Sequence, residues 1–314
     1  MAILRTNAGL GEVFIGRPKI VSWERLWAFS GGPFRAVNWP ARNIHTDLEY
    51  AAACGLPSRV AASATQFQGY VVELMIDLFG VEWLSLGTMD VKFIRTVNRG
   101  DTLTSTAVVK SKEANDSATR FTMGVDCRNQ LDEAVLVGTA TGAVGGKLPV
   151  TVDQFTGRVD EAKTMCTQLS GPDSPQMDPL EFPVTPELNQ QFLYAEEDFD
   201  SRYIEGTGPE LPIVHPALVL CWSNDTRSPS YVAPSLSDKK PMWATLHTRD
   251  QTFFCNPARV GSRLNVTWTR LGSYEKRGRR YSVSKILVVD EHGTFIVKRL
   301  YYTTKASHEY GVKV

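Results

Sequence analysis

Four residues whose side chains could move or stabilise a proton stand close together near the start of the chain. His45 is preceded by Arg42 and Asn43 and followed by Asp47. An imidazole can act as base and acid, because its ordinary pKa of about 6.5 leaves both forms populated at neutral pH. We therefore take His45 and Asn43 as candidate catalytic residues. Arg42 and Asp47 are candidate substrate-binding residues, although a lone histidine also serves as a capping or core residue and Arg42 as a surface cation.

A short helix with a capped start follows the histidine. Thr46 and Glu49 have the spacing of a capping box, in which a hydroxyl and a carboxylate pair with amides that lack partners at a helix start. Gly55 and Pro57 end this helix, because glycine readily adopts a left-handed backbone conformation and proline lacks an amide donor. A longer and mostly apolar helix is predicted over residues 60–79.

The start of the long helix offers groups that could hold a substrate carbonyl. Its first amides have no partner inside the helix and carry partial positive charge. Ser63, Thr65 and Gln66 add side-chain donors, and we take them as candidate substrate-binding residues. The chemistry is therefore expected where this helix begins, beside His45.

Residues 43–57 resemble the signature of the MaoC-like, (R)-specific enoyl-CoA hydratases. In that family a motif of the form Asp-x-Asn-Pro-(Ile/Leu)-His-x-Asp leads into a short helix, a Gly-x-Pro exit and the central helix of a hotdog fold. His45, Asp47, the short helix and its exit at Gly55 and Pro57 match this pattern. The resemblance implies a hotdog fold, an acyl-CoA or similar thioester as substrate, acid/base catalysis by the histidine, and no cofactor or metal.

The chain departs from this pattern at a position that matters for catalysis. The family's catalytic aspartate lies five residues before its histidine, and Pro40 occupies that position here. Half of the expected Asp/His pair is therefore missing. We expect Asn43 or Asn38 to hold a water molecule instead, and Asp47 either to orient the imidazole or to place negative charge at the helix start.

Alternating strand patterns follow the long helix and return later in the chain. Residues 91–103 align with residues 252–264, and the alignment extends without a gap to residues 129–132 and 290–293. Repetition of this kind indicates two copies of one unit. Each copy is predicted to be an antiparallel sheet wrapped around a central helix, which gives an α+β chain with a tandem, or double, hotdog fold.

The predicted domain boundaries follow from this repeat. Residues 1–150 form an N-terminal hotdog domain with the histidine, the proline-rich residues 151–186 form a linker, and residues 187–314 form a degenerate C-terminal hotdog domain. The second copy lacks the histidine motif and a capped short helix, so one working site per chain is expected. His215 precedes Pro216 at the start of the second central helix, where it either packs at the interface or contacts the substrate.

The composition is that of an ordinary globular chain of 314 residues with no net charge. Nothing in it favours nucleic acid. No apolar run reaches the roughly 20 residues that span a bilayer, and the first residues lack the apolar region of a secretory signal, so we expect a cytoplasmic protein. The five cysteines are scattered, which fits neither a disulfide framework nor a zinc site.

Two further features leave alternatives open. Basic residues gather in a predicted turn at residues 276–280, which is either a solvated hairpin or a site that captures the phosphates of a coenzyme A carrier. His247 lies in an alternating stretch and either lines the interface between the copies or faces solvent.

These patterns together predict a metal-independent hydratase/dehydratase, a hydro-lyase that acts on an enoyl or 3-hydroxyacyl thioester with His45 as general acid/base. One alternative is a lyase, isomerase or cyclase on the same scaffold that lost water activation together with the aspartate. The other is a non-catalytic hotdog protein that binds acyl chains. The expected partner is a small molecule, with no nucleic acid and no membrane, and the chain could form a homodimer.

Overall fold

The computed structural model describes residues 4–31, 42–56, 59–114, 118–145, 154–167, 177–206, 211–233, 242 and 244–306. Within these residues the strands are β1 (Val13–Ile15), β2 (Lys19–Ile20), β3 (Thr88–Phe93), β4 (Thr102–Ala114), β5 (Thr119–Arg128), β6 (Ala134–Val144), β7 (Leu180–Pro183), β8 (Thr245–Phe254), β9 (Arg263–Lys276), β10 (Arg279–Asp290) and β11 (Phe295–Lys305). The helices are α1 (Trp23–Ser30), α2 (Leu48–Ala53), α3 (Ala64–Phe79), α4 (Trp83–Leu86), α5 (Gln154–Met165), α6 (Pro186–Glu196) and α7 (Pro216–Trp222), with two short 3-10 turns, η2 (Ser201–Tyr203) and η3 (Asp225–Arg227).

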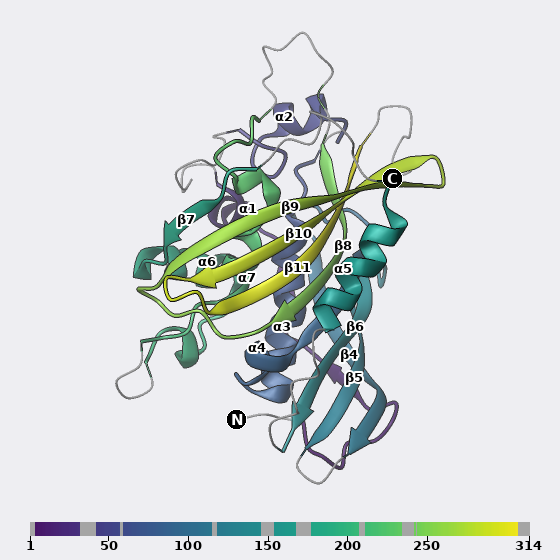
Figure 1. Cartoon of the computed structure of the whole chain (residues 1–314), viewed down its shortest axis with the longest axis vertical. Helices are drawn as coiled ribbons and strands as arrows, with labels where there is room; N and C mark the ends of the chain where they lie inside the picture. Colours follow the sequence, from purple (N-terminus) through teal and green to yellow (C-terminus); the bar gives the residue numbers. More distant parts are fainter. Residues whose placement is uncertain are drawn as a thin grey trace.

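The strands of the described residues join in one antiparallel sheet. Its order is β1-β4-β5-β6-β3-β8-β11-β10-β9-β7, and β2 pairs separately with β4. The second half of this order is the mirror image of the first, with β3 and β8 adjacent at the centre (Figure 1). The predicted tandem hotdog architecture of the α+β class is therefore confirmed.

The tight turns of the two meanders also correspond. Gly100 and Gly261, which occupy aligned positions, have φ angles of 91° and 90°. Asp132 and Gly293, also aligned, have φ angles of 59° and 79°. Both copies therefore need a left-handed residue at the same two turns, which explains why the sequence alignment runs without a gap.

The two central helices lie inside the molecule and touch each other. Fourteen of the sixteen residues of α3, and all seven residues of α7, are buried. A helix that is apolar on all sides belongs in a core, and one apolar cluster includes side chains of both copies. Figure 1 shows α1, α3, α6 and α7 behind the strands of the second copy and α5 in front of them.

Residues 151–186, predicted as a linker, contain α5 and β7. The apolar side of α5, formed by Phe155, Val159 and Ala162, packs on the outer face of the second copy's strands. β7 pairs with β9, just as β1 pairs with β4 at the other end of the sheet. The point within this segment at which the two units divide stays a prediction.

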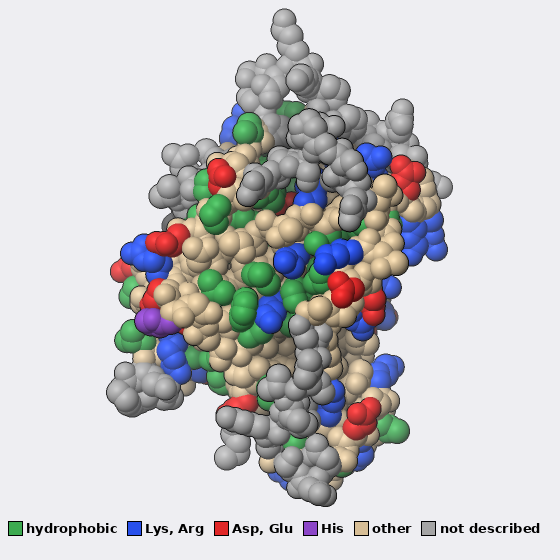
Figure 2. All heavy atoms as spheres, in the orientation of Figure 1, with side chains coloured by type: hydrophobic (Ala, Val, Ile, Leu, Met, Phe, Trp, Pro, Cys, Tyr) green, Lys and Arg blue, Asp and Glu red, His purple; other side chains and the backbone are tan. Residues whose placement is uncertain are grey.

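The surface visible in Figure 2 carries charges of both signs, and the cysteines form no disulfides. Acidic and basic side chains are interspersed over the face seen in Figure 2. All five cysteines are free, and four of them are buried. In the described parts of the chain, every helix is too short or too polar to cross a bilayer.

Candidate functional site

Asn43 builds the turn that carries the candidate base. Its side-chain amide donates a hydrogen bond to the carbonyl of Ser30 at the end of α1 (3.0 Å) and its Oδ1 accepts one from the backbone amide of His45 (2.9 Å). Its backbone carbonyl accepts from the amides of Thr46 and Asp47 at 3.2 and 3.1 Å. The buried Asn43 therefore positions His45, and its role in holding a water molecule stays a prediction.

The imidazole of His45 is fixed through one nitrogen. Nδ1 lies 2.7 Å from the carbonyl oxygen of Ala61, while the amide of Ala61 donates to the carbonyl of Ile44 at 3.3 Å. A carbonyl only accepts, so the neutral ring carries its proton on Nδ1 and a lone pair on Nε2. Nε2 has no hydrogen-bond partner in the described residues. Because Ala61 lies two residues before Ser63, the cap of α3, the ring stands beside the start of the central helix.

The environment of His45 favours the neutral ring. Burial lowers its pKa from the ordinary value to about 4, and the nearby Arg227 guanidinium also lowers it, whereas the hydrogen bond to Ala61 raises it by less. The neutral ring, which can accept a proton at Nε2, is therefore favoured over the charged ring at neutral pH.

The helix after His45 begins one residue later than the capping box predicts. Asp47 is the cap, and its Oδ1 accepts from the amide of Tyr50 at 2.9 Å. Among the described residues the buried Thr46 hydroxyl has no hydrogen-bond partner, and Glu49 pairs with Arg42 (2.5 Å) instead of closing a box. Asp47 caps the helix instead of Thr46 because a carboxylate is a stronger acceptor than a hydroxyl and places negative charge at the helix start.

The two predicted substrate-binding residues at this helix are already paired. Arg42 is exposed and donates to Asp47 (2.5 and 3.0 Å), and the two acidic partners raise its pKa. The Asp47 carboxylate in turn holds Arg42 and the amide of Tyr50, so the orientation of the imidazole comes from the Ala61 carbonyl and not from Asp47. Contact of either residue with a substrate stays a prediction. Pro40 and Asn38 lie outside the described residues.

The predicted donors at the start of α3 are buried and connect the two copies. Ser63 and Thr65 share a hydrogen bond between their hydroxyls (2.9 Å), and Asn224 donates to Thr65 (3.3 Å). The amide of Gln66 donates to the carbonyl of Ala195 at 3.3 Å. Ser63 makes no side-chain hydrogen bond to the first amides of α3 within the described residues.

His215 caps the second central helix and is fully buried. Its Nδ1 accepts from the amide of Ala217 (3.3 Å), which puts the ring proton on Nε2, 3.3 Å from a carboxylate oxygen of Asp198. Burial would raise the pKa of Asp198, but the contact with His215, the Lys19 ammonium and the amide of Asp200 together outweigh it and lower the pKa to about 2. This geometry matches the packing alternative for His215, and a substrate contact stays a prediction.

Buried charged side chains of both copies meet near the end of α6. Lys19 donates to the carbonyl of Glu196 (2.6 Å) and pairs with Glu73 (2.5 Å), and all three are buried. A short turn, η2, stands where α2 stands in the first copy, and Asp200 caps it by accepting from the amide of Arg202 at 2.9 Å. The expectation that the second copy lacks any capped short helix is therefore wrong.

His247 lines the interface between the copies, which resolves one open alternative. Its ring lies between Phe93 of the first copy (4.4 Å between centroids) and Tyr301 (4.1 Å). Its Nε2 lies 3.2 Å from the buried Asp250 carboxylate. Burial lowers the pKa of His247, and the Asp250 contact opposes this.

A cavity of about 650 Å³ lies in the second copy, close to the helix that follows His45. Its wall includes Thr245 and Lys305, next to Ala244 and Ala306, which pack against α2. The amide of Ala244 donates to the carbonyl of Cys54 at the end of α2 (3.2 Å). The cavity therefore lies near the end of α2, the helix that follows His45.

Sequence reasoning missed Arg227 and Asp225, which belong to η3. Arg227 is buried, stacks on Trp222 (4.8 Å from guanidinium carbon to ring centre) and acts electrostatically on His45. Asp225 is buried and lines the cavity. The one available signal is a run of polar residues directly after an apolar helix, and such a run usually indicates a loop. Among the described residues, no group of three or more His, Cys, Asp or Glu side chains is placed to hold a metal ion.

Comparison by sequence finds no matching protein-family profile and no matching curated protein. Comparison by structure finds MaoC-like dehydratases. A MaoC domain protein dehydratase of Chloroflexus aurantiacus J-10-fl has a TM-score of 0.68 at 13% identity, over 96% of this chain and 97% of that one. A conserved hypothetical protein of Mycobacterium tuberculosis with a double hotdog fold has a TM-score of 0.59 at 14% identity, over 96% and 97% of the two chains.

A third similar structure belongs to a larger enzyme. Full-length peroxisomal multifunctional enzyme type 2 of Drosophila melanogaster has a TM-score of 0.54 at 13% identity, and the match covers 93% of this chain and 48% of that one. At 13 to 14% sequence identity, the similarity of these structures shows a shared fold and no more. The chain therefore has the double hotdog fold of the MaoC-like dehydratases.

Proposed function

We propose that the chain is a hydratase/dehydratase that acts on enoyl and 3-hydroxyacyl thioesters, with His45 as the proton-transferring group. The observation that carries this proposal is the imidazole held at Nδ1 by the Ala61 carbonyl, with Nε2 unpartnered beside the start of α3. The shared fold with MaoC-like dehydratases supports the reaction class.

One imidazole can serve both halves of the reaction. In hydration, Nε2 of His45 accepts a proton from water while the water oxygen bonds to Cβ, and the alkene electrons move onto the thioester as an enolate. The ring then returns this proton to Cα, which restores the neutral base. Because a single ring delivers and removes the proton, oxygen and hydrogen add to the same face of the double bond. Dehydration is the reverse of these steps.

The developing negative charge needs partial positive charge nearby. The amides of Ala64 and Thr65 at the start of α3 are suited to supply it, because among the described residues the Ser63 side chain does not cap them, whereas the amide of Gln66 donates to the Ser63 carbonyl (3.0 Å). A ring whose pKa is about 4 gains its proton only while the enolate is close, because the enolate stabilises the imidazolium. The enolate and the charged ring therefore form together.

The test compares His45→Gln with wild type on a panel of 2-enoyl-CoA thioesters of increasing chain length. General acid–base catalysis contributes roughly 100-fold or more, so we expect kcat/KM to fall by at least that factor. His292→Gln is the matched control, because His292 is exposed in the β10–β11 turn. Circular dichroism checks that both variants fold, and equal turnover by His45→Gln and wild type would remove His45 from the mechanism.

Labelled water separates hydration from the other reactions of this scaffold. Hydration in ¹⁸O-water places the label on Cβ, and hydration in deuterium oxide places one deuterium on Cα. Deuterium exchange at Cα without oxygen at Cβ would indicate an isomerase, and thioester binding without either label would indicate a non-catalytic acyl-binding protein.

A further inference from the structure

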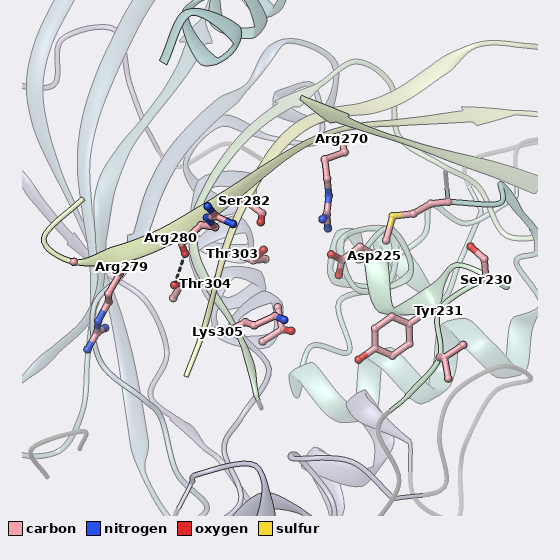
Figure 3. A pocket seen from close by; sticks show the side chains of 14 residues that line it. Asp225, Ser230, Tyr231, Arg270, Arg279, Arg280, Ser282, Thr303, Thr304 and Lys305 are labelled. Carbon is pink, nitrogen blue, oxygen red and sulfur yellow. Dashed lines mark hydrogen bonds between the residues drawn. The ribbon is translucent and has the colours of Figure 1, made fainter. Parts of the chain in front are cut away.

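The cavity in the second copy has walls of opposite chemical character. One wall is the sheet, where Arg270 of β9, Ser282 of β10 and Thr303 of β11 point inward, with Lys305 at the end of β11 (Figure 3). The other wall is formed by Asp225 of η3 and by Tyr231. A cavity of about 650 Å³ lies within the size range of small-molecule sites, which is about 300 to 1,000 Å³.

Four cations line the cavity, Arg270, Arg279, Arg280 and Lys305. Arg279 and Arg280 interact with other groups, Arg280 through an ion pair with Glu275 (3.8 Å). Neither Arg270 nor Lys305 has a side-chain hydrogen bond or ion pair in the parts of the chain that the structure describes. Arg270 extends toward Asp225 in Figure 3 and acts on it electrostatically, yet the two side chains form no ion pair. A gap therefore separates a guanidinium from the carboxyl group that faces it.

Asp225 is a buried carboxyl group with one oxygen, Oδ1, that has no hydrogen-bond partner. Burial raises its pKa, and the opposing effect of Arg270 is smaller. Burial therefore disfavours the charged form of Asp225, which weakens its repulsion of an anion in the cavity.

We propose that this cavity binds an oxyanion, a carboxylate or phosphate group of a ligand, through Arg270 and Lys305 with Ser282 and Thr303 as hydroxyl donors. Arginine and lysine are the side chains that hold such groups, by forked and point-charge contacts respectively. The cavity adjoins α2, which follows His45, so a thioester substrate is one ligand that could reach both places. That connection rests on the proposed function, and the binding of the anion does not.

The first experiment measures binding without turnover. Pyrophosphate and glutarate are titrated by calorimetry into wild type, Arg270→Gln, Lys305→Met and the control Lys285→Met. Lys285 carries the same charge on β10, between Val283 and Leu287, which face α5 on the other side of the sheet. Loss of one charged hydrogen bond weakens binding roughly tenfold, so we expect that factor for Arg270→Gln and Lys305→Met and wild-type affinity for Lys285→Met.

The second experiment identifies the source of the anion. Turnover of a 2-enoyl-CoA is compared with that of the matching pantetheine thioester, which lacks the coenzyme's nucleotide phosphates, and both are made with a methyl and with a carboxylate end on the acyl chain. A rise in KM for Arg270→Gln with coenzyme A substrates alone assigns the site to a phosphate. A rise with both carboxylate-ended substrates assigns it to the acyl chain.

The outcomes separate the two proposals. If no thioester turns over and pyrophosphate or glutarate still binds in an Arg270-dependent way, the anion site stands and the proposed reaction fails. If Arg270→Gln, Lys305→Met and Lys285→Met all bind both anions as wild type does, or wild type binds neither anion, the anion site is rejected. Arg270→Lys, which keeps the charge, checks that a loss in Arg270→Gln reflects charge and not misfolding.

Discussion

The partner of Nδ1 decides what His45 can do. A carboxylate at Nδ1 would stabilise the imidazolium and keep the ring pKa near neutral, whereas the Ala61 carbonyl carries no full charge. Arg227 makes the charged ring still less favourable. A histidine in this setting is a weak base at rest, and its proton affinity rises only when negative charge develops next to it.

This setting predicts an unusual pH dependence. We expect kcat/KM for hydration to remain constant from pH 7 down to about pH 5 and to fall below it with a midpoint near pH 4, where Nε2 becomes protonated. An ordinary histidine would give a midpoint of about 6.5. The profile is measured with one enoyl thioester, with circular dichroism at each pH. A midpoint near pH 6.5 in folded protein would show that the ring is not desolvated as described.

The cap of α2 gives a second prediction. Asp47→Ala removes the side chain that accepts from the amide of Tyr50, and loss of such a cap costs roughly 1 kcal/mol of unfolding free energy. Thr46→Val should leave the unfolding free energy unchanged or slightly increase it, because the Thr46 hydroxyl is buried without a partner. Urea denaturation of both variants measures the difference. A larger loss of unfolding free energy for Thr46→Val than for Asp47→Ala would indicate that Thr46 caps the helix, as the capping box predicts.

The central helix depends on glycine at one contact. A methyl group on Gly69 would collide with the Glu196 carboxylate and would lie 2.9 Å from Cβ of Ala217 in α7. The close approach of α3 to α6 and α7 therefore requires a residue without a side chain at this point.

Gly69→Ala and Gly157→Ala should consequently have opposite effects. In an unobstructed helix, Gly to Ala increases stability by up to about 1 kcal/mol, and we expect this at Gly157 in α5, where nothing lies within 4 Å of the added methyl group. At Gly69 the collision should outweigh the helix preference and lower stability by about 1 to 3 kcal/mol. Thermal and urea unfolding measure both. An increase in stability for Gly69→Ala would mean that the helices separate at little cost.

Many of the helices and strands were predictable because their signals are local, although α5 and β7 lie in the segment predicted as a linker. Ser22 accepts from the amide of Arg25 at the start of α1, and Gly55 has the φ angle of 84° that its position after α2 requires. The cap of α2 was not predictable in the same way, because Thr46 and Asp47 are both good caps and only the path of the turn on Asn43 selects between them. Local patterns indicate that a helix starts, and tertiary contacts determine the residue at which it starts.

The site as a whole could be predicted only in part. The motif around His45 points to the candidate base, and the repeat identifies the fold. Arg227 and Asp225 come from the other copy, 180 or more positions after His45 in the sequence, and Arg227 acts on His45 because the two copies share one core. Spacing along the chain carries no information about such contacts, and neither the low pKa of His45 nor the cavity could be deduced before the packing of η3 was known.

The junction between the copies predicts that they unfold as one unit. β3 and β8 are hydrogen-bonded neighbours, and Asp90 of the first copy accepts from Arg249 (2.8 and 2.6 Å) and from Gln251 (3.0 Å) of the second. Sheet, core and ion pair therefore all cross the boundary. Damage to a buried contact in one copy should lower the stability of both.

Arg299 is the residue with which to test this. It is fully buried, pairs with Asp250 and donates to the carbonyl of Leu220 at the end of α7 (2.8 Å). Arg299→Met leaves the Asp250 carboxylate buried without its cation, which costs about 3 to 5 kcal/mol. The control is Arg263→Met, which breaks an exposed pair with Glu181 and should change stability by less than about 1 kcal/mol.

Hydrogen exchange with mass spectrometry distinguishes one unfolding unit from two, because slow exchange in core strands occurs only through global opening. In Arg299→Met, peptides from β5 in the first copy should lose protection by the same free energy as peptides from β10 in the second, although no contact of Arg299 involves β5. Loss of protection confined to β8 to β11 would mean that the copies unfold independently and that the shared core contributes little to their coupling.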